Sequence, residues 1–471
     1  MALIKSISGI RGTIGGDYGS NLTPQDIVEC TAAFGTWILT KKNSKKAKVV
    51  IGRDARISGA MVSALVSNTL ISLGIDVVDL GLSTTPTVEI AVPDENADAG
   101  IILTASHNPK EWNALKLLNS KGEFISAQDG SEVLSMIESG TIRYADIDDL
   151  GTYSQNNTYI QKHIDKILAL PLVNKAAVEA KKFRVVVDAI NSTGAISIVP
   201  LLEQMGCSVT LINGEVNGHF AHNPEPLPQN LNQLAREVLN KNAHLGIAVD
   251  PDVDRLAFVC DDGECFGEEY TLVAVADFVL QHTPGNTVSN LSSTRALQVV
   301  TEKYKQSYAA AAVGEVNVVT KMKETNAIIG GEGNGGVIYP ALHYGRDAMV
   351  GVALMLSSLA QFAKPLSFMR KKYPEFNITK QKIDLPNGVN VDDLLNSLDD
   401  KYALMKSCTR NRIDGLKIDF SDGNWIHMRK SNTEPIIRIY AESTSEVIAD
   451  NLIEKINRDI YEILNAKPEE V

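Results

Sequence analysis

The sequence predicts an α/β protein of four domains, three of similar α/β construction and a last one of α+β type. The order strand, helix, strand recurs along the chain up to about residue 371 and then changes. In addition, 471 residues are too many for one hydrophobic core, because domains average roughly 150 residues. Both observations indicate several similar units followed by a different one.

Short apolar runs alternate with longer stretches that place their apolar residues on one helical face. The first unit has expected elements at 48–52, 58–73 and 76–80. The second has 183–188, 193–205 and 208–212, then a helix at 231–239 and a strand at 245–249. The third and shorter unit has 287–291, 294–304 and 309–313. We therefore expect three related βαβ units.

A different order of elements begins near residue 372. Strands are expected at 378–384, 415–420, 424–429 and 436–442, with helices at 392–401 and 447–464. This order is typical of an α+β module. We therefore predict domains at 1–152, 153–255, 256–372 and 373–471.

Composition excludes several classes of function. The formal charge of −12 and the pI near 5.3 argue against nucleic acid as a partner, although one local phosphate pocket remains compatible with them. No uncharged apolar run approaches the roughly 20 residues that span a bilayer, so we expect a cytoplasmic protein without membrane contact. The five cysteines lack paired spacing, which argues against a disulfide framework and a cysteine zinc site.

The most informative stretch is Thr-Ala-Ser-His-Asn-Pro at 104–109. It follows the apolar run 99–103 and ends in a proline, so Ser106 is a candidate nucleophile on a loop. A serine in a turn is otherwise a common turn former. Because a bare serine is a poor nucleophile at neutral pH, this hypothesis needs a partner elsewhere in the chain that stabilises the charge of the reacting groups.

Asp-Pro-Asp-Val-Asp-Arg at 250–255 supplies such a partner, directly after the expected strand 245–249. Asp250, Asp252 and Asp254 can point carboxylate oxygens at one hard cation, and Mg²⁺ suits such a site. Arg255 would lie beside a transferring phosphoryl group. An EF-hand is excluded, because Arg255 stands where that loop needs glycine. A solvated acidic turn stays open, as does a haloacid dehalogenase-like phosphatase with Asp250 as the nucleophile.

Two later loops carry binding chemistry. In the glycine-rich segment 330–336, Glu332 and Asn334 suit paired sugar hydroxyls, although a ligand-free glycine hinge fits as well. The segment 429–435, followed by Arg438, gathers arginines, hydroxyls and backbone amides as a phosphate cradle does. Arg11 and Lys116 are single cations that suit charge compensation or proton transfer, or are solvated surface residues.

These four motifs, in this order over nearly the whole chain, resemble the α-D-phosphohexomutase superfamily. The resemblance implies a heart-shaped arrangement of four domains and a phosphoserine at Ser106. It also implies that Ser106, Asp250, Asp252 and Asp254 hold Mg²⁺, that Arg255 offsets the transferring charge, and that Lys116 is the general acid/base. His107 and Arg11 would line the reacting centre. The other residues carried over would bind substrate: Glu332 and Asn334 the sugar, and Arg429, Ser431, Asn432, Thr433 and Arg438 the phosphate that does not react.

The reaction implied by the resemblance interconverts hexose 6-phosphate and hexose 1-phosphate through a bound 1,6-bisphosphate, which also serves as activator. Small-molecule hexose phosphates would be the partners, and a homodimer is compatible with the family. Because two binding modes must close on the same loops, we expect hinge motion of the last domain.

Departures from the family pattern bear on the substrate. This chain has Asn334-Gly335-Gly336 where many bacterial members have Ser-Gly-His, and Glu315 where some relatives have His. Together with the segment 343–347, these features favour the phosphoglucosamine mutase branch, which converts glucosamine 6-phosphate to glucosamine 1-phosphate. Ser431-Asn432-Thr433 instead resembles the phosphomannomutase/phosphoglucomutase branch, which stays as the alternative.

Two alternatives come from other classes. The phosphatase described above would not need the distant Arg429 loop. A non-catalytic sugar-phosphate sensor would keep the Glu332 and Arg429 loops without needing Ser106 and three aspartates together. A serine hydrolase lacks the Gly-x-Ser-x-Gly elbow.

Overall fold

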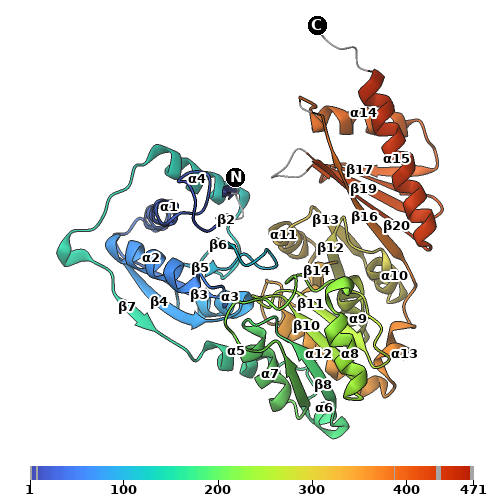
Figure 1. Cartoon of the computed structure of the whole chain (residues 1–471), viewed down its shortest axis with the longest axis horizontal. Helices are drawn as coiled ribbons and strands as arrows, with labels where there is room; N and C mark the ends of the chain where they lie inside the picture. Colours follow the sequence, from blue (N-terminus) through green and yellow to red (C-terminus); the bar gives the residue numbers. More distant parts are fainter. Residues whose placement is uncertain (1–2, 7–8, 387, 431–435, 467–471) are drawn as a thin grey trace.

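The computed structural model describes residues 3–6, 9–386, 388–430 and 436–466. Four sheets follow one another along the chain (Figure 1). The first three are mixed and carry helices, while the last is antiparallel. The predicted fold class, three α/β domains and a C-terminal α+β domain, is thereby confirmed.

The first sheet has seven strands in the order β1-β2-β6-β5-β3-β4-β7. Its strands are β1 (Leu3–Ser6), β2 (Gly9–Thr13), β3 (Ala47–Arg53), β4 (Ile75–Leu82), β5 (Ala99–Leu103), β6 (Trp112–Leu118) and β7 (Tyr153–Gln155). Helices α1 (Pro24–Lys42), α2 (Gly59–Ser72) and α4 (Ala127–Ser139) share one apolar core with the sheet, and α3 (Thr85–Asp94) shares another. Strands buried by two separate cores lie between layers of helix, as is usual for the parallel strands β3, β4 and β5.

The second and third sheets share one plan. In the order β11-β10-β8-β9, the strands are β8 (Arg184–Asp188), β9 (Ser208–Ile212), β10 (Leu245–Val249) and β11 (Leu256–Cys260). In the order β13-β12-β14-β15, they are β12 (Asn286–Asn290), β13 (Tyr308–Ala311), β14 (Ala327–Glu332) and β15 (Gly336–Ile338). Three strands of each sheet run parallel and the last one runs antiparallel.

The helices of these two domains pack around their sheets. They are α5 (Tyr159–Leu168), α6 (Lys175–Lys181), α7 (Gly194–Gln204), α8 (Asn232–Asn240), α9 (Glu268–His282), α10 (Ala296–Lys303), α11 (Glu315–Thr325), α12 (Ala348–Phe362) and α13 (Leu366–Arg370). Two 3₁₀ turns, η1 (Ile147–Asp149) and η2 (Pro228–Asn230), lie in the connections. Helix α12 is buried nearly all round and packs against α5, α6, α7 and α9, so one continuous core joins both domains.

The predicted boundary after residue 255 falls between β10 and β11. These two strands pair along their whole length, from Leu245 opposite Cys260 to Val249 opposite Leu256. A domain boundary would split this ladder. We therefore propose that the second domain ends after β11 and that the third begins with α9.

The C-terminal domain is a five-stranded antiparallel sheet in the order β16-β20-β19-β18-β17. Its elements are β16 (Asn377–Asp384), α14 (Val391–Ala403), β17 (Cys408–Asn411), β18 (Leu416–Phe420), β19 (Trp425–Lys430), β20 (Ile436–Ser443) and α15 (Glu446–Ala466). Strand β17 is an addition to the predicted elements. Its sequence Cys-Thr-Arg-Asn has no apolar alternation and none of its residues is buried, so no hydrophobic pattern marks it.

The loops singled out in the first three domains occupy equivalent places. Loop 104–111 joins β5 to the antiparallel β6, loop 250–255 joins β10 to the antiparallel β11, and loop 333–335 joins β14 to the antiparallel β15. Each therefore follows the carboxyl end of a strand that has one parallel neighbour, and open α/β sheets place their sites at such strand ends. The repeated fold brings these three motifs together.

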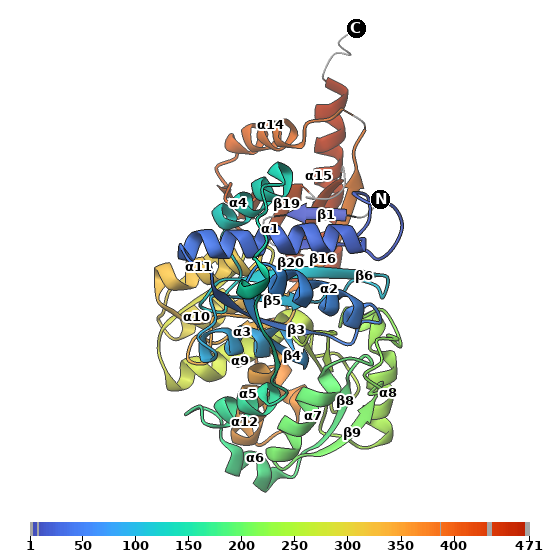
Figure 2. The same ribbon diagram turned by 90° about the vertical axis from the view of Figure 1, so that its left-hand side faces the viewer.

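The four domains follow an arc, with the first and the last at its two ends (Figure 1). The view turned by 90° shows the C-terminal domain standing beyond α1 and α4 of the first domain (Figure 2). None of the described helices combines the length and apolar character needed to cross a membrane.

Candidate active site

Ser106 lies in a strained, tightly held loop. Its backbone φ is 48°, a left-handed value that costs a non-glycine residue energy and often marks a functional site. The Ser106 amide donates to Thr104 Oγ1 at 2.9 Å, and Thr104 Oγ1 donates to Asp54 Oδ2 at 2.6 Å. The Ser106 side chain is therefore presented by a loop with a fixed backbone.

Arg56 binds the main chain of this loop through its guanidinium. The sequence motifs did not identify this residue. Its guanidinium donates to the carbonyl oxygens of Asn108 and Pro109, each at 2.7 Å, and of Trp112 at 2.9 Å, as well as to that of Ser106. Its Nε pairs with Asp54 at 3.1 Å, and both side chains are fully buried. Because the carbonyl groups belong to the main chain, no residue pattern in the sequence signals this contact.

The three aspartates form a buried cluster next to Ser106. Ser106 Oγ donates to Asp250 Oδ2 at 2.6 Å, and Asp250 Oδ1 accepts the amides of Asp254 and Arg255, each at 3.1 Å. All three carboxylates have 0% exposure. One ligand oxygen from each lies within 4.8 Å of the others.

This cluster suits a metal ion. Asp252 Oδ1 and Asp254 Oδ1 are buried and have no hydrogen-bond partner within the described chain. Burial and the charges of Asp254 and Asp252 raise the pKa of Asp250 well above its usual value. Carboxylate oxygens that lack hydrogen-bond partners and repel one another suit a hard divalent cation. The triad is therefore a candidate metal centre.

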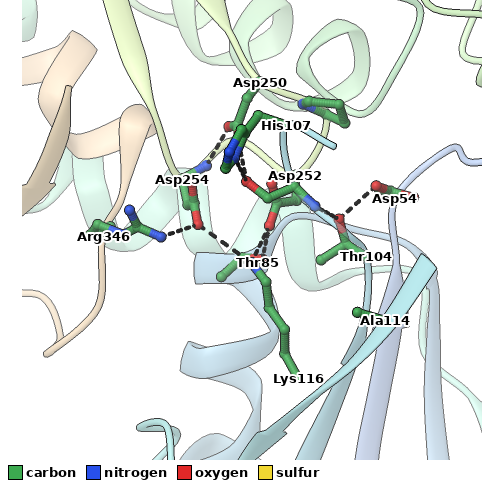
Figure 3. Close-up of polar contacts among 12 residues, drawn as sticks. Asp54, Thr85, Thr104, His107, Ala114, Lys116, Asp250, Asp252, Asp254 and Arg346 are labelled. Carbon is green, nitrogen blue, oxygen red and sulfur yellow. Dashed lines mark hydrogen bonds and ion pairs between the residues drawn. The ribbon is translucent and has the colours of Figure 1, made fainter. Parts of the chain in front are cut away.

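Lys116 reaches the same cluster from β6. Its Nζ lies 2.8 Å from Asp252 Oδ2 and 3.5 Å from Asp254 Oδ2. Burial alone would lower the pKa of Lys116, but these two carboxylates outweigh it and raise the pKa above the ordinary value. Lys116 is therefore a cation in this site, with a proton to donate. Figure 3 shows Lys116, His107 and Arg346 reaching the triad from different sides.

His107 lies between Ser106 and Arg255, within hydrogen-bond distance of both. His107 Nδ1 is 3.3 Å from Ser106 Oγ, and its Nε2 is 3.5 Å from Arg255 Nη2. Burial and the charge of Arg255 lower the pKa of His107 well below its usual value, so the imidazole is neutral. Arg255 pairs with Glu225 at 2.7 Å, while its buried Nε has no hydrogen-bond partner among the described residues.

Arg346 joins the metal loop to the sugar loop. Its guanidinium pairs with Asp254 Oδ2 at 2.7 Å, and with Glu315 and Glu332, each at 2.9 Å. Arg346 lies in the segment 343–347 that the sequence analysis used only as a marker of substrate branch. Its central place in the site was not predicted.

Glu332 and Asn334 are held by the third domain. Glu332 Oε1 accepts from Asn290 Nδ2 at 2.8 Å and from the Gly314 amide at 3.0 Å. Asn334 Oδ1 accepts the Gly336 amide at 3.2 Å. The Glu315 carboxylate already pairs with Arg346, so an amino sugar would have to share or displace that contact.

The predicted phosphate site lies on the C-terminal sheet. Arg429 on β19 is paired with Arg438 on β20, and Arg429 Nε lies 3.5 Å from Asp414 Oδ2. Desolvation and the like charge of Arg438 lower the pKa of Arg11, so the charges of these two arginines repel one another. Ser431, Asn432 and Thr433 lie outside the described residues.

Comparison with known proteins identifies the family. The models of the phosphoglucomutase/phosphomannomutase family match the chain in four parts: alpha/beta/alpha domain I at 3–143, domain II at 161–263, domain III at 267–376 and the C-terminal domain at 384–458. A probable phosphoglucosamine mutase of Methanopyrus kandleri is 31% identical over 468 residues, covering 97% of this chain and 98% of the relative.

Two further comparisons agree. A phosphoglucomutase/phosphomannomutase of Thermococcus kodakarensis is 33% identical, covering 94% of this chain and 96% of the relative. The crystal structure of a phosphoglucomutase/phosphomannomutase family protein from Burkholderia thailandensis superposes with a TM-score of 0.83 at 26% identity, covering 97% of this chain and 96% of that one. Fold, site and relatives together define an intramolecular phosphotransferase for sugar phosphates. The chain belongs to the phosphoglucomutase/phosphomannomutase family.

Proposed function

We propose that this enzyme interconverts glucosamine 6-phosphate and glucosamine 1-phosphate by way of a phosphoserine at Ser106 and a bound 1,6-bisphosphate. The observation that carries the proposal is the hydrogen bond of 2.6 Å from Ser106 Oγ to Asp250, within a buried triad that has two orphaned carboxylate oxygens. A phosphoryl group on this oxygen would lie beside both the candidate metal centre and Arg255.

The proposed step moves one phosphoryl group and one proton. The bond from phosphorus to Ser106 Oγ breaks while a bond to the sugar hydroxyl oxygen forms. Lys116 begins as a cation, so it donates a proton to the leaving Ser106 oxygen and then takes the proton of the sugar hydroxyl. The freed hydroxyl then donates to Asp250, as it does in this structure.

Charge stabilisation comes from several cations around the reacting centre. Ser106, Asp250, Asp252 and Asp254 would hold Mg²⁺, which supplies positive charge beside the transferring group. Arg255 and Arg11 would add fixed positive charge, and the neutral His107 would orient the reacting oxygen.

The remaining residues would bind the substrate at two places. Glu332 and Asn334 would hold sugar hydroxyls, because both are fixed by the backbone of the third domain. Arg429, Arg438, Ser431, Asn432 and Thr433 would hold the phosphate that does not react. Two separate anion sites allow the 1,6-bisphosphate to turn over and present its other phosphate, which simple hydrolysis does not require.

The choice of glucosamine rests on the acidic groups around Arg346. Glu315 and Glu332 are both buried beside the proposed sugar site, and a protonated amino group can join their ion-pair network. Relatives carry the names of both branches of the family. Glucose and mannose phosphates are therefore the alternative substrates. Because sugar phosphates are charged and cross a lipid bilayer poorly, we place the enzyme in the cytoplasm.

The test compares substrates directly. Phosphorus NMR would follow glucosamine 6-phosphate, mannose 1-phosphate and glucose 1-phosphate, each with Mg²⁺ and catalytic hexose 1,6-bisphosphate. We expect the highest initial rate at low substrate with glucosamine 6-phosphate. Faster isomerisation of glucose or mannose phosphate would overturn the substrate assignment, and release of free phosphate alone would indicate a phosphatase.

A further inference from the structure

A second cluster of ligand-type side chains lies outside the proposed phosphoryl-transfer site. His163 on α5, His343 and Asp347 offer one ligand atom each, and these atoms lie within 4.8 Å of one another. His163 and Asp347 have 0% exposure. Nothing in the proposed phosphoryl transfer uses these three side chains.

The ligand atoms point at one another with suitable spacing. Asp347 uses Oδ1 to cap α12, accepting the amides of Met349 at 2.8 Å and Val350 at 3.2 Å. Its Oδ2 lies 2.9 Å from His163 Nε2 and 3.2 Å from His343 Nε2. Ligands about 2.0–2.1 Å from one tetrahedral ion lie roughly 3.3 Å apart, so small adjustments would admit an ion.

Each imidazole also has an outer partner on α3 of the first domain. His163 Nδ1 lies 2.9 Å from Thr87 Oγ1, and His343 Nδ1 lies 3.3 Å from Glu89 Oε2. Metal-binding histidines typically direct the second ring nitrogen at a hydroxyl, carbonyl or carboxylate, which fixes the ring and the tautomer. His163 forms such a hydrogen bond with Thr87, whereas His343 Nδ1 faces Glu89 at an ion-pair distance without hydrogen-bond geometry.

Glu89 is a separate sign that a cation is needed. Its side chain is 1% exposed, and neither carboxylate oxygen has a hydrogen-bond partner within the described residues. An ionised carboxylate in that position is costly unless positive charge lies nearby.

Protonated His343 can supply that charge in the absence of an ion. A dication bound at Nε2 would replace one proton by two positive charges and leave the Nδ1 proton directed at Glu89. The same geometry therefore serves a metal ion with better charge balance.

We propose that His163, His343 and Asp347 bind a divalent transition-metal ion of the zinc class, with Glu89 and Thr87 as outer partners. Two imidazole nitrogens select such an ion over Mg²⁺, which prefers oxygen ligands. Three protein ligands leave a fourth position for water. This site does not depend on the proposed substrate or phosphoryl transfer.

Such an ion would tie three segments of the chain together. It would join α5 to the start of α12, and through Glu89 and Thr87 it would reach α3. Arg346 is the residue before Asp347 and pairs with Asp254. Binding at this cluster would thereby help to position Arg346 against the candidate magnesium centre.

The test measures bound Zn²⁺ in the full-length protein. Metal-stripped protein would be equilibrated with Zn²⁺ in excess Mg²⁺, which occupies the aspartate triad, then dialysed and analysed for zinc. We expect one equivalent in the wild type and in Asp252→Asn, and less than about a tenth in His343→Gln. His282→Gln is the matched control, because His282 is exposed and bonds only within its own helix.

Glu89→Gln keeps all three ligands and the shape of the side chain, so it separates binding from folding. We expect it to weaken zinc affinity about 10–100-fold at an unchanged melting temperature. Co²⁺ in place of Zn²⁺ should also give visible absorption bands that are lost in His343→Gln and kept in Asp252→Asn. A wild type that holds no zinc, or a His343→Gln variant that holds a full equivalent, would overturn the site in favour of an ion-free imidazolium network.

Discussion

At the residue scale, Arg56 fixes the main chain of the serine loop. Its guanidinium satisfies four main-chain carbonyl groups between Ser106 and Trp112 and pairs with Asp54. Removing one partner of a buried ion pair leaves an unpaired charge in the interior. The loop geometry around the nucleophile therefore depends on a side chain about fifty positions earlier.

Arg56→Met should accordingly cost about 3–5 kcal/mol of stability and lower kcat far more than KM, because the orientation of Ser106 is lost. Denaturant unfolding and initial-rate kinetics would measure both. Arg53→Met is the control, since Arg53 donates one hydrogen bond, to the Asp54 carbonyl group. Equal losses in the two variants would contradict the role assigned to Arg56.

The charge of Asp250 is predicted to lower the stability of the metal-free protein, although the active site needs this carboxylate. Its pKa is raised in the folded state, so its favourable contribution to stability is complete below the unfolded pKa near 3.9 and is lost as the pH rises through the folded pKa. Asp250→Asn removes the buried charge and should raise the melting temperature of metal-free protein at pH 7 by about 2–4 °C.

The same variant should lose activity, and added Mg²⁺ should stabilise the wild type but not Asp250→Asn. Calorimetry at pH 3.5 and pH 7, with and without Mg²⁺, would test the sign. A variant that is less stable than metal-free wild type at pH 7 would contradict strain at the triad.

At the scale of elements, the site consists of three equivalent strand-to-strand loops. The loop at 333–335 shows how closely they pack. Gly335 has a φ of 85°, and a Cβ atom there would overlap the carbonyl oxygen of Leu256 at the start of β11. Because this close approach joins the sugar loop to the metal loop, it needs glycine.

Gly335→Ala should therefore destabilise the protein by more than about 2 kcal/mol and reduce kcat/KM. Gly388→Ala is a matched control, because its φ is 86° but a Cβ atom there would meet no described atom within 4 Å. The two substitutions carry similar backbone strain. Equal unfolding free energies would contradict the packing of these loops.

Which of these elements the sequence predicts depends on whether their residues form an apolar pattern. Apolar periodicity located the buried strands β8 and β10 because both are apolar runs within sheets. It missed β17, which has no buried residue. It also placed a domain boundary inside the β10–β11 ladder, since antiparallel return of a strand leaves no signal in a single sequence.

The site residues divide in a similar way: the sequence predicts those that lie in local motifs and does not predict those that act through distant contacts. Ser106 and the three aspartates were named from the sequence because motif and spacing are local properties, and the structure brings them together. Arg56, Glu89 and Arg346 act through contacts with distant backbone or side chains. Such partners are set by the tertiary fold, so local patterns do not reveal them.

At the scale of the whole molecule, hydrogen bonds join the C-terminal domain to the third domain. Lys417 Nζ donates to the Leu291 carbonyl at 3.0 Å, His427 Nδ1 lies 2.9 Å from Ser292 Oγ, and the Val313 amide donates to Asp414 at 3.0 Å. An interface of this polar kind permits rotation between domains.

We therefore expect the C-terminal domain to close towards Arg11 when a bisphosphate bridges the two ends of the arc. Small-angle scattering should show a smaller radius of gyration with hexose 1,6-bisphosphate and Mg²⁺ than without them. Arg438→Ala, which removes one cation of the phosphate site, should reduce this change. Identical profiles with and without ligand would contradict closure.

The homodimer suggested by the sequence stays a prediction, and sedimentation in the same buffers would test it.

The measurement that tests the central claim most directly is the site of phosphoryl attachment. The protein would be incubated with radiolabelled hexose 1,6-bisphosphate and Mg²⁺, digested, and mapped by mass spectrometry, with Ser135→Ala as a control for loss of an exposed serine. We predict acid-stable label on Ser106, none in Ser106→Ala, and turnover in that variant lowered by about 10³-fold or more. Label that persists in Ser106→Ala, or that hydroxylamine removes as it does an acyl phosphate on Asp250, would contradict the account.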